Sequence, residues 1–142
     1  MNRKIFVTGA TSGIGLECAR AFAKDGNHLL LAGRRADRLA AIKEDFEQQY
    51  GVRVDTLVLD VSKREDVDAK VKPAVEAFGG IDVLVNNAGV TKDNLIVKMS
   101  MEDFMDIINI NLVSAFNCSK FASKIMIRQR SGKIINMTSV SG

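Results

Sequence analysis

Three glycines follow an apolar stretch near the start of the chain, in the run Thr8-Gly9-Ala10-Thr11-Ser12-Gly13-Ile14-Gly15. Glycine tolerates positive φ and has no Cβ, so a turn of this kind can bend sharply and let an anion approach the backbone. The amides at the N-terminus of a following helix suit a pyrophosphate. A tight connection that needs its glycines only for packing is the alternative. The candidate cofactor-binding residues here are Gly9, Thr11, Ser12, Gly13, Ile14 and Gly15.

Two arginines follow the next apolar run, in Gly33-Arg34-Arg35. A site for NAD usually presents an acidic residue to the ribose hydroxyls at this place, whereas guanidinium groups suit the 2′-phosphate of NADP. The sequence therefore favours NADP(H), with Arg34 and Arg35 as phosphate ligands. The alternative is that these two residues and Arg38 only decorate a helix start, although cations are mildly unfavourable at that end of the helix dipole.

Polar residues also end the third and fourth apolar runs. The third run ends in an aspartate and a valine, which could place a carboxylate and a backbone amide beside an adenine or could simply cap the next helix. The fourth ends in two asparagines, an alanine and a glycine at residues 86–89. Unsatisfied buried amides are costly, so these amides should bind neighbouring backbone or a ligand. The candidates for cofactor binding here are Asp60, Val61, Asn87, Ala88 and Gly89.

Segments of helical periodicity alternate with short β-type runs at residues 4–8, 28–32, 54–59, 82–85 and 133–137. Several runs are apolar almost throughout, which is typical of parallel strands covered on both faces. With right-handed crossovers, this pattern predicts an α/β protein with a doubly wound parallel sheet of order 3-2-1-4-5. Its ligand crevice should lie at the carboxyl ends of strands 1 and 4. The 142 residues, 46% of them hydrophobic, are enough for one domain over residues 1–142.

Three of the helices carry specific expectations. The first should bury an apolar stripe formed by Ile14, Cys18, Ala21 and Phe22, with Ala19 as a further candidate. Another should open with a capping box at Ser62 and Glu65, and should be kinked or broken at Pro73. A long helical pattern runs over residues 101–130 and should carry an interface as well as a core face.

The chain resembles the short-chain dehydrogenases/reductases over essentially its whole length. The resemblance rests on the TGxxxGIG-like residues 8–15, the LDV triplet at residues 59–61, the NNAG motif at residues 86–89 and a strand-5 segment at residues 134–139. It implies a Rossmann fold that lacks the family's C-terminal strands and helices. It also implies catalytic roles for Asn111, which resembles the helix asparagine of the family's catalytic tetrad, and for Ser139, which resembles its serine.

The residues themselves leave both catalytic roles open. An asparagine in a long apolar helix is poorly favoured by propensity, so Asn111 should use its amide to hold a backbone break or a water, a role that Asn109 could share. Ser139 follows strand 5, where it could offer its hydroxyl to a substrate carbonyl oxygen. As the alternative, Thr138, Ser139 and Ser141 could be ordinary turn residues.

The resemblance implies an oxidoreductase that transfers hydride between NADP(H) and a carbonyl or alcohol carbon. In such enzymes a tyrosine is the acid/base, a lysine lowers its pKa, a serine orients the substrate oxygen and an asparagine fixes a water. The YxxxK pair is missing here, because the only tyrosine, Tyr50, has no lysine four residues later. We therefore expect an N-terminal portion of a longer enzyme that binds the cofactor and is inactive alone. The alternative is a non-catalytic nucleotide-binding or interaction module.

Within the family, different segments resemble different branches. Residues 87–95 and 131–142 most resemble 3-oxoacyl-(acyl-carrier-protein) reductases, whereas residues 32–35 and 38–39 look more like the hydroxy-acid and serine dehydrogenases. The expected substrate is a carbonyl compound, either small or bound to an acyl carrier. The long helix resembles the one through which these enzymes form dimers and tetramers, so a full-length protein is expected to be a homo-oligomer.

Composition argues against several other functions. A net charge of +3, with basic residues mostly interleaved with acidic ones, gives little support to nucleic-acid binding. No apolar run approaches the length of a membrane span, and a cytoplasmic protein is expected. Cys18 and Cys118 have no metal-type spacing, so we expect reduced thiols and no metal site. His28, at a turn into a strand, is assigned no function.

Overall fold

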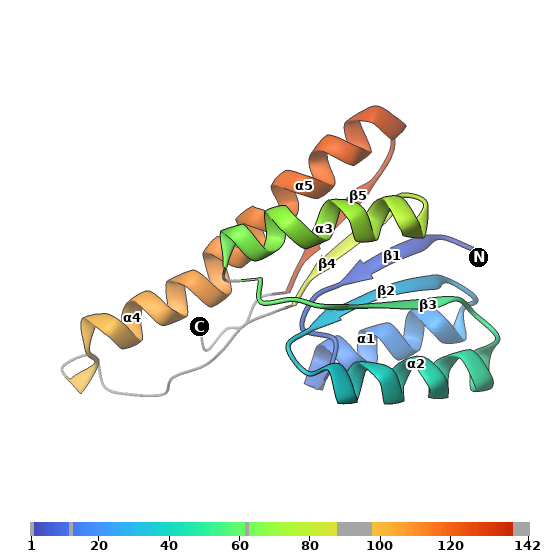
Figure 1. Ribbon diagram of the computed structural model, residues 1–142, viewed down its shortest axis with the longest axis horizontal. Coiled ribbons are helices and arrows are strands. Elements are labelled where there is room, and N and C mark those ends of the chain that lie inside the picture. The colour runs from blue at the N-terminus through green and yellow to red at the C-terminus, as the bar shows by residue number, and fades with distance from the viewer. Residues whose placement is uncertain (1, 12, 62, 88–97, 138–142) are drawn as a thin grey trace.

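The computed structural model of the chain describes residues 2–11, 13–61, 63–87 and 98–137, with all their side chains except those of residues 109 and 110. Five parallel strands form one sheet in the order β3-β2-β1-β4-β5 (Figure 1). The strands are β1 (Lys4–Val7), β2 (His28–Gly33), β3 (Val54–Val58), β4 (Val83–Asn86) and β5 (Lys133–Asn136). The predicted fold class and strand order are confirmed, and each strand ends within one residue of its expected limits.

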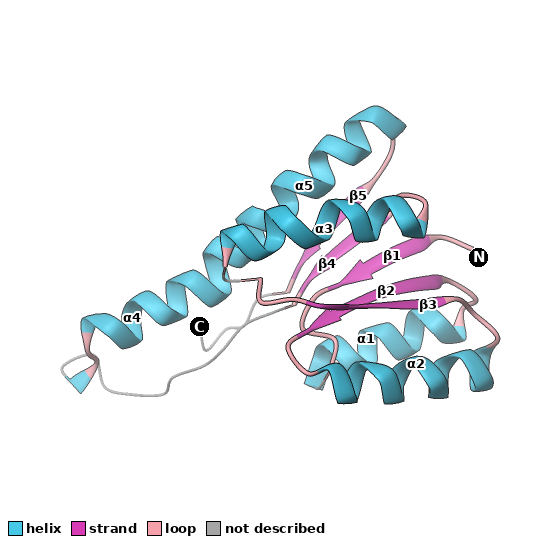
Figure 2. Cartoon of the chain, in the orientation of Figure 1, coloured by secondary structure: helices cyan, strands magenta, loops and turns pink. Residues whose placement is uncertain are grey.

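Helices cover both faces of the sheet (Figure 2). One face carries α1 (Gly13–Lys24) and α2 (Ala36–Tyr50), and the other carries α3 (Arg64–Phe78) and α5 (Ser114–Gln129). Successive side chains of a strand point to opposite faces. In β1, Phe6 therefore joins the core under α3 and α5, while its two neighbours, residues 5 and 7, join the core under α1 and α2. This burial on both faces explains why the inner strands are apolar throughout.

The buried face of α1 differs from the expected stripe. Its buried residues are Gly15, Ala19 and Ala23. Ile14 is instead 64% exposed and Ala21 is exposed, while Cys18 and Phe22 are half-buried. Small residues four apart let the helix lie close to the sheet, which leaves larger side chains on its flanks. The expectation for Ile14 and Ala21 was wrong because it followed side-chain size and not the spacing of the small residues.

α3 runs without interruption through Pro73, so the expectation of a break into two pieces was wrong. Pro73 is exposed, and water can therefore replace the backbone hydrogen bond that its missing N–H removes. The helix begins one residue later than a capping box would place it. Lys63 is its N-cap residue and makes no side-chain capping hydrogen bond, and Ser62 lies outside the described residues.

The predicted long helix is present but changes its winding. α4 (Met101–Ile107) leads into a π-helix, η2 (Ile108–Val113), and then into α5. The hydroxyl of Ser100 caps the start of α4 by accepting a hydrogen bond from the Asp103 N–H at 3.0 Å. No residue of α4 is buried, and α4 extends past the ends of the strands (Figure 1). The helix ends near the predicted place, at Arg130 with a left-handed φ of 61°.

Candidate functional site

Three glycines in and after the turn between β1 and α1 have two different structural reasons. Two of them have a positive φ, and the third lies very close to neighbouring atoms. Gly9 and Gly13 have φ values of 60° and 59°, in the left-handed region. A Cβ on Gly15 would come within 2.2 Å of the Gly9 carbonyl oxygen and 2.3 Å of Asn87 Nδ2, whereas a Cβ on Gly13 would meet nothing within 4 Å. Packing therefore accounts for Gly15. At Gly13, the first residue of α1, the positive φ and not packing accounts for the glycine.

Hydrogen bonds join the end of β1 to the end of β4. Thr8 Oγ1 accepts a hydrogen bond from the Asn87 N–H at 3.1 Å and donates one to the Val85 carbonyl at 3.4 Å. The Asn87 side-chain amide donates to the Gly9 carbonyl at 3.2 Å. β1 and β4 are the neighbouring strands whose following helices, α1 and α5, cover opposite faces of the sheet, and ligands of doubly wound folds bind at such a point.

The other asparagine of this motif, Asn86, is buried and joins three elements. Its amide nitrogen donates to Ser119 Oγ of α5 at 3.0 Å and to Asn136 Oδ1 of β5 at 2.9 Å. The expectation that buried amides here find partners is confirmed for both Asn86 and Asn87. Sequence reasoning missed Ser119 and Asn136, although Asn136 ends the last apolar run just as Asn86 ends the fourth.

A cavity of about 390 Å³ opens beside this network, between α5 with its preceding π-helix and the ends of β4 and β5. Asn111 of the π-helix lines it, together with apolar Leu112 and Phe116. A π-turn inside a helix is frequently found at functional sites. At Asn111 the helical backbone is thus widened and not broken, and the expectation that its amide holds a break or a water stays a prediction.

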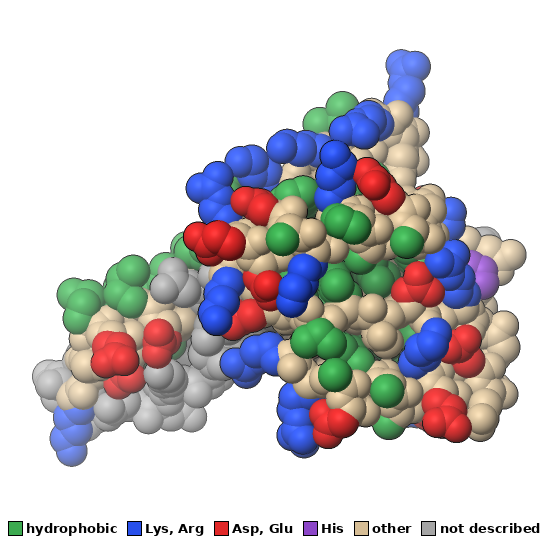
Figure 3. All heavy atoms as spheres, viewed as in Figure 1, with side chains coloured by type: hydrophobic (Ala, Val, Ile, Leu, Met, Phe, Trp, Pro, Cys, Tyr) green, Lys and Arg blue, Asp and Glu red, His purple; other side chains and the backbone are tan. Residues whose placement is uncertain are grey.

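Arginines lie where the end of β2 meets the glycine turn. A Cβ on Gly33 would come within 2.8 Å of Thr11 Cγ2, so the two loops touch. Arg34 and Arg35 follow directly and are exposed. In the space-filling view, Lys and Arg side chains gather with Asp and Glu side chains between the starts of α2 and α3 (Figure 3).

Only one of these arginines is paired among the residues that the structure describes. Arg35 contacts Asp37 with 3.2 Å between Nη2 and Oδ2, whereas Arg34 and Arg38 make no ion pair there. The hydrogen bond from the Arg35 guanidinium, followed by one from the Arg38 backbone, lowers the pKa of the Asp37 carboxyl. Arg35 is also the N-cap residue of α2 and makes no capping hydrogen bond with its side chain. Among the described residues, the guanidinium groups of Arg34 and Arg38 are therefore not held by an ion pair.

The end of β3 completes this edge of the sheet. The Leu59 N–H donates to the Gly33 carbonyl at 2.9 Å, which places Asp60 and Val61 beside the end of β2. Val61 is buried, and the Asp60 N–H donates to Asp66 Oδ2 of α3 at 3.0 Å. This hydrogen bond, and then the one from Lys70, lowers the pKa of Asp66. The backbone of Asp60 is thus bound to the first turn of α3, while both interpretations of its carboxylate stay predictions.

The structure therefore brings most of the described candidates to one edge of the sheet, at the carboxyl ends of the strands. The contacts join Gly9, Thr11, Gly15, Gly33 and Asn87 directly. The candidates Ser12, Ala88, Gly89 and Ser139 lie outside the described residues. Within the described part of the chain, no cluster of His, Cys, Asp and Glu could hold a metal ion, and none of the helices is long and apolar enough to cross a membrane.

Comparison with known proteins gives consistent matches. The family model described as short chain dehydrogenase matches residues 3–142. The chain is 41% identical over 144 residues to the 3-oxoacyl-[acyl-carrier-protein] reductase FabG of Staphylococcus epidermidis, covering 100% of this chain and 58% of that protein. It is 40% identical over 136 residues to the reductase of the same name from Thermotoga maritima, covering 96% of this chain and 55% of that protein.

Two solved structures show the same fold. An alcohol dehydrogenase from Thermococcus sibiricus, complexed with 5-hydroxy-NADP, has a TM-score of 0.93 and 37% identity, covering 98% of this chain and 59% of that one. An L-sorbose reductase from Gluconobacter frateurii, complexed with NADPH and L-sorbose, has a TM-score of 0.92 and 34% identity, covering 98% of this chain and 53% of that one. The chain thus spans little more than half the length of each protein that it matches.

Proposed function

The chain belongs to the short-chain dehydrogenase family, and from this premise we propose that it is the nucleotide-binding part of an NADP(H)-dependent oxidoreductase. The reaction would be hydride transfer between the nicotinamide and a carbonyl or alcohol carbon. The observation that carries this proposal is the contact between the glycine turn and the end of β2, because it brings Arg34, the residue after Gly33, close to the turn that leads into α1. Arg34 makes no ion pair within the part of the chain that the structure describes.

The residues present fit a dinucleotide phosphate. A Cβ on Gly13, the first residue of α1, would meet no atom within 4 Å, and the backbone N–H groups and dipole at a helix N-terminus favour an anion. Arg34 and Arg35 directly follow the end of β2, where a 2′-phosphate would need a counter-charge. We therefore assign cofactor binding to the following described residues, Gly9, Thr11, Gly13, Ile14, Gly15, Arg34, Arg35, Asp60, Val61 and Asn87, and to Ser12, Ala88 and Gly89.

When bound, the nicotinamide cofactor would supply or accept the hydride. In this scheme Asn111 holds a water at the wall of the cavity beside Asn86, and Ser139 orients and polarises the substrate oxygen by donating a hydrogen bond to it. Asn86 would fix the relative position of α5 and β5, and in the sequence Asn111 precedes α5 and Ser139 follows β5.

The tyrosine and lysine that the family resemblance implies have no counterpart within these 142 residues. Tyr50 is the last residue of α2 and packs edge to face on Phe46, with ring centroids 5.7 Å apart. It therefore lies at the opposite end of α2 from the arginines. We expect the 142-residue polypeptide to bind NADPH and to reduce no carbonyl substrate by itself.

The substrate that we propose is a 3-oxoacyl thioester, free or bound to an acyl carrier, because the reductases that match this chain are named for that reaction. The test is NADPH oxidation, followed by its absorbance, with a 3-oxobutanoyl thioester and the product of the natural gene. Turnover supports the reductase. NADPH binding with no turnover of any carbonyl by that gene product would favour the second candidate, a non-catalytic nucleotide-binding module.

A homo-oligomer in the cytoplasm is part of the same proposal. Large apolar side chains are exposed along η2 and α5, with Leu112 63%, Phe116 64% and Ile127 76% exposed. An apolar stripe of this kind on a long helix suits the dimer and tetramer contacts of the family. The two cysteines are free thiols, as expected in a reducing compartment.

A further inference from the structure

β3 forms one edge of the sheet. The N–H and C=O groups of its successive residues point in turn toward β2 and away from the sheet. On its inner side the Arg53 carbonyl accepts from the Leu29 N–H, and the Leu59 N–H donates to the Gly33 carbonyl, both at 2.9 Å. The hydrogen-bonding groups of successive residues in a strand point to opposite sides. The N–H and C=O groups of residues 54, 56 and 58 therefore point outward, where an edge strand can pair with another chain.

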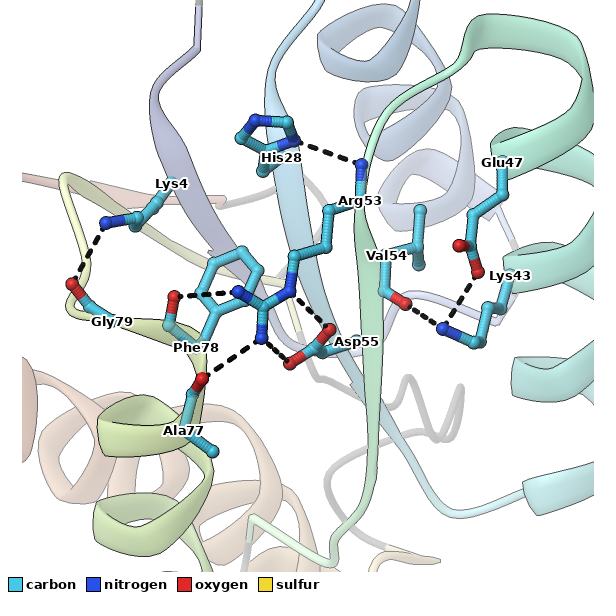
Figure 4. A network of polar contacts seen from close by, with 10 residues as sticks. All are labelled: Lys4, His28, Lys43, Glu47, Arg53, Val54, Asp55, Ala77, Phe78 and Gly79. Atoms are coloured by element: carbon cyan, nitrogen blue, oxygen red, sulfur yellow. Dashed lines mark hydrogen bonds and ion pairs between the residues drawn. The ribbon is translucent and has the colours of Figure 1, made fainter.

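Two lysines from opposite faces of the sheet reach this outer side. Lys43 Nζ of α2 donates a hydrogen bond to the Val54 carbonyl (Figure 4). Lys70 Nζ of α3 donates to the Val58 carbonyl at 3.2 Å. Of the three outward-pointing carbonyl groups, the first and the last thus already accept a hydrogen bond from a lysine ammonium group. Thr56 is the outward-pointing residue between them.

Each lysine is held in place by a carboxylate on its own helix. Lys43 contacts Glu47 at 2.8 Å, and Lys70 contacts Asp66 at 3.2 Å, both four residues apart along the helix. Pairs at this spacing face each other on a helix. The carboxylates therefore reduce the freedom of the two ammonium groups and keep them at the strand edge.

We propose that the outer edge of β3 can pair with the same strand of a second copy of this chain, and that Lys43 and Lys70 prevent this pairing by occupying the Val54 and Val58 carbonyl groups. A strand that pairs here must take the Val54 and Val58 carbonyls from the ammonium groups and must bring its own backbone past them. Lysines on an edge strand oppose such pairing in natural sheets. This inference is independent of the proposed oxidoreductase function.

A second copy is the occupant that the strand itself fits. In an antiparallel pair centred on Thr56, residue 54 of one copy lies opposite residue 58 of the other, so that a valine meets a valine at both ends. Asp55 likewise lies opposite Leu57 and not opposite another carboxylate. Thr56 is exposed and Val58 is 44% exposed, so their side chains are available to a partner, whereas the side chain of Val54 is buried in the core under α1 and α2. The central pair, Thr56 opposite Thr56, joins two β-branched side chains, and such pairs across two strands are favourable.

The experiment removes the two ammonium groups and locates any new contact. Lys43→Met/Lys70→Met keeps the aliphatic stems and deletes the donors. Lys24→Met/Lys72→Met removes the same charge at two exposed lysines with no hydrogen bond or ion pair among the described residues. Each double variant also carries Thr56→Cys and is treated with a short bismaleimide, which cross-links two thiols. The same double variants without Thr56→Cys measure the background cross-linking through the native cysteines.

We expect at least about tenfold more cross-linked dimer in the Lys43→Met/Lys70→Met protein than in the control pair. Adding Thr56→Pro to chains without the new cysteine should abolish their extra dimer in light scattering, because proline removes the outward N–H at the centre of the edge. Equal cross-linking in both pairs, or association that survives Thr56→Pro, would overturn the proposal. If the double variant loses its helical circular dichroism, Lys70→Met alone, against Lys72→Met, decides the question by the same readouts.

Discussion

The backbone of Gly15 lies directly against the carboxamide of Asn87, so that a Cβ on this glycine would be 2.3 Å from Asn87 Nδ2 and 2.2 Å from the Gly9 carbonyl oxygen. The same carboxamide donates to that carbonyl at 3.2 Å. The start of α1, the glycine turn and the end of β4 therefore interlock at one point. The residues of this edge that we propose to bind the cofactor depend on that point for their relative positions.

Gly15→Ala should lower the free energy of unfolding by about 1 to 3 kcal/mol, the usual cost of adding a methyl group where backbone and side chain leave no room. Gly13→Asn is the matched control, because asparagine tolerates the left-handed φ of 59° and meets no nearby atom. Urea unfolding followed by circular dichroism measures both. Equal losses in the two variants would contradict the close approach at Gly15.

Asp66→Asn should reduce stability in a pH-dependent way. The hydrogen bond from the Asp60 N–H, followed by the contact with Lys70, lowers the pKa of Asp66 in the folded state. The stabilisation is therefore fully present above the ordinary aspartate pKa of about 3.9 and is lost as the pH falls through the lower, folded value.

The urea concentration at the midpoint of unfolding should accordingly be lower for Asp66→Asn than for the unmodified chain at neutral pH. The difference between the two midpoints should become smaller in acid. Asp68→Asn on the same helix is the control, since Asp68 contacts Arg64 at 3.7 Å on the exposed surface and no other residue of the described part of the chain in an ion pair. A gap that is constant over the whole pH range would show that the charge of Asp66 is not the cause.

The two cysteines should react at very different rates. Burial raises the pKa of the Cys118 thiol to about 12, and Cys118 lies in the core under α3 and α5. Cys18 is half-buried on α1. Because the thiolate is the nucleophile, mildly alkaline iodoacetamide should label Cys18 in the native chain and Cys118 only after unfolding. Peptide mass spectrometry at timed intervals measures this, and early labelling of Cys118 would contradict the packing of α5.

Much of the site was predictable because the carboxyl ends of parallel strands share one edge of a sheet. Glycines after the first apolar run and arginines after the second had to lie near one another once the strand order was known, and the contact between Gly33 and Thr11 confirms it. The order itself followed from apolar runs and right-handed crossovers.

Other features depend on contacts between residues far apart in the sequence. Ser119 and Asn136 meet Asn86 from 33 and 50 residues away. Nothing in the local sequence of Ser119 distinguishes it from a surface residue, whereas the place of Asn136 at the end of an apolar run was a signal that was missed. Lys43 and Lys70 look like ordinary helix-surface charges until the direction of the β3 carbonyls is known. The π-helix was not predictable as such, because its apolar spacing is the same as that of the helix around it.

Asp37→Asn should raise the affinity for NADPH by about two- to fivefold and leave the affinity for NADH unchanged, since an exposed ion pair is worth about 0.2 to 1 kcal/mol. The variant frees the Arg35 guanidinium from a carboxylate now 3.2 Å away. Asp45→Asn, further along the same helix, loses an exposed contact with Arg20 of α1 and is the control. Fluorescence titration measures both cofactors, and an equal change for NADPH and NADH would show that Arg35 does not meet the 2′-phosphate.

The measurement that tests the central claim most directly is calorimetric titration of the 142-residue chain with NADPH and with NADH, alone and as Arg34→Ala. We predict that NADPH binds more tightly than NADH and that Arg34→Ala weakens NADPH binding by about 10- to 150-fold, the loss of one charge-assisted contact, with NADH unaffected. Arg128→Ala, an exposed arginine in the last turn of α5, should change neither. Equal affinity for the two cofactors, or equal weakening of both by Arg34→Ala, would contradict the NADP(H) site.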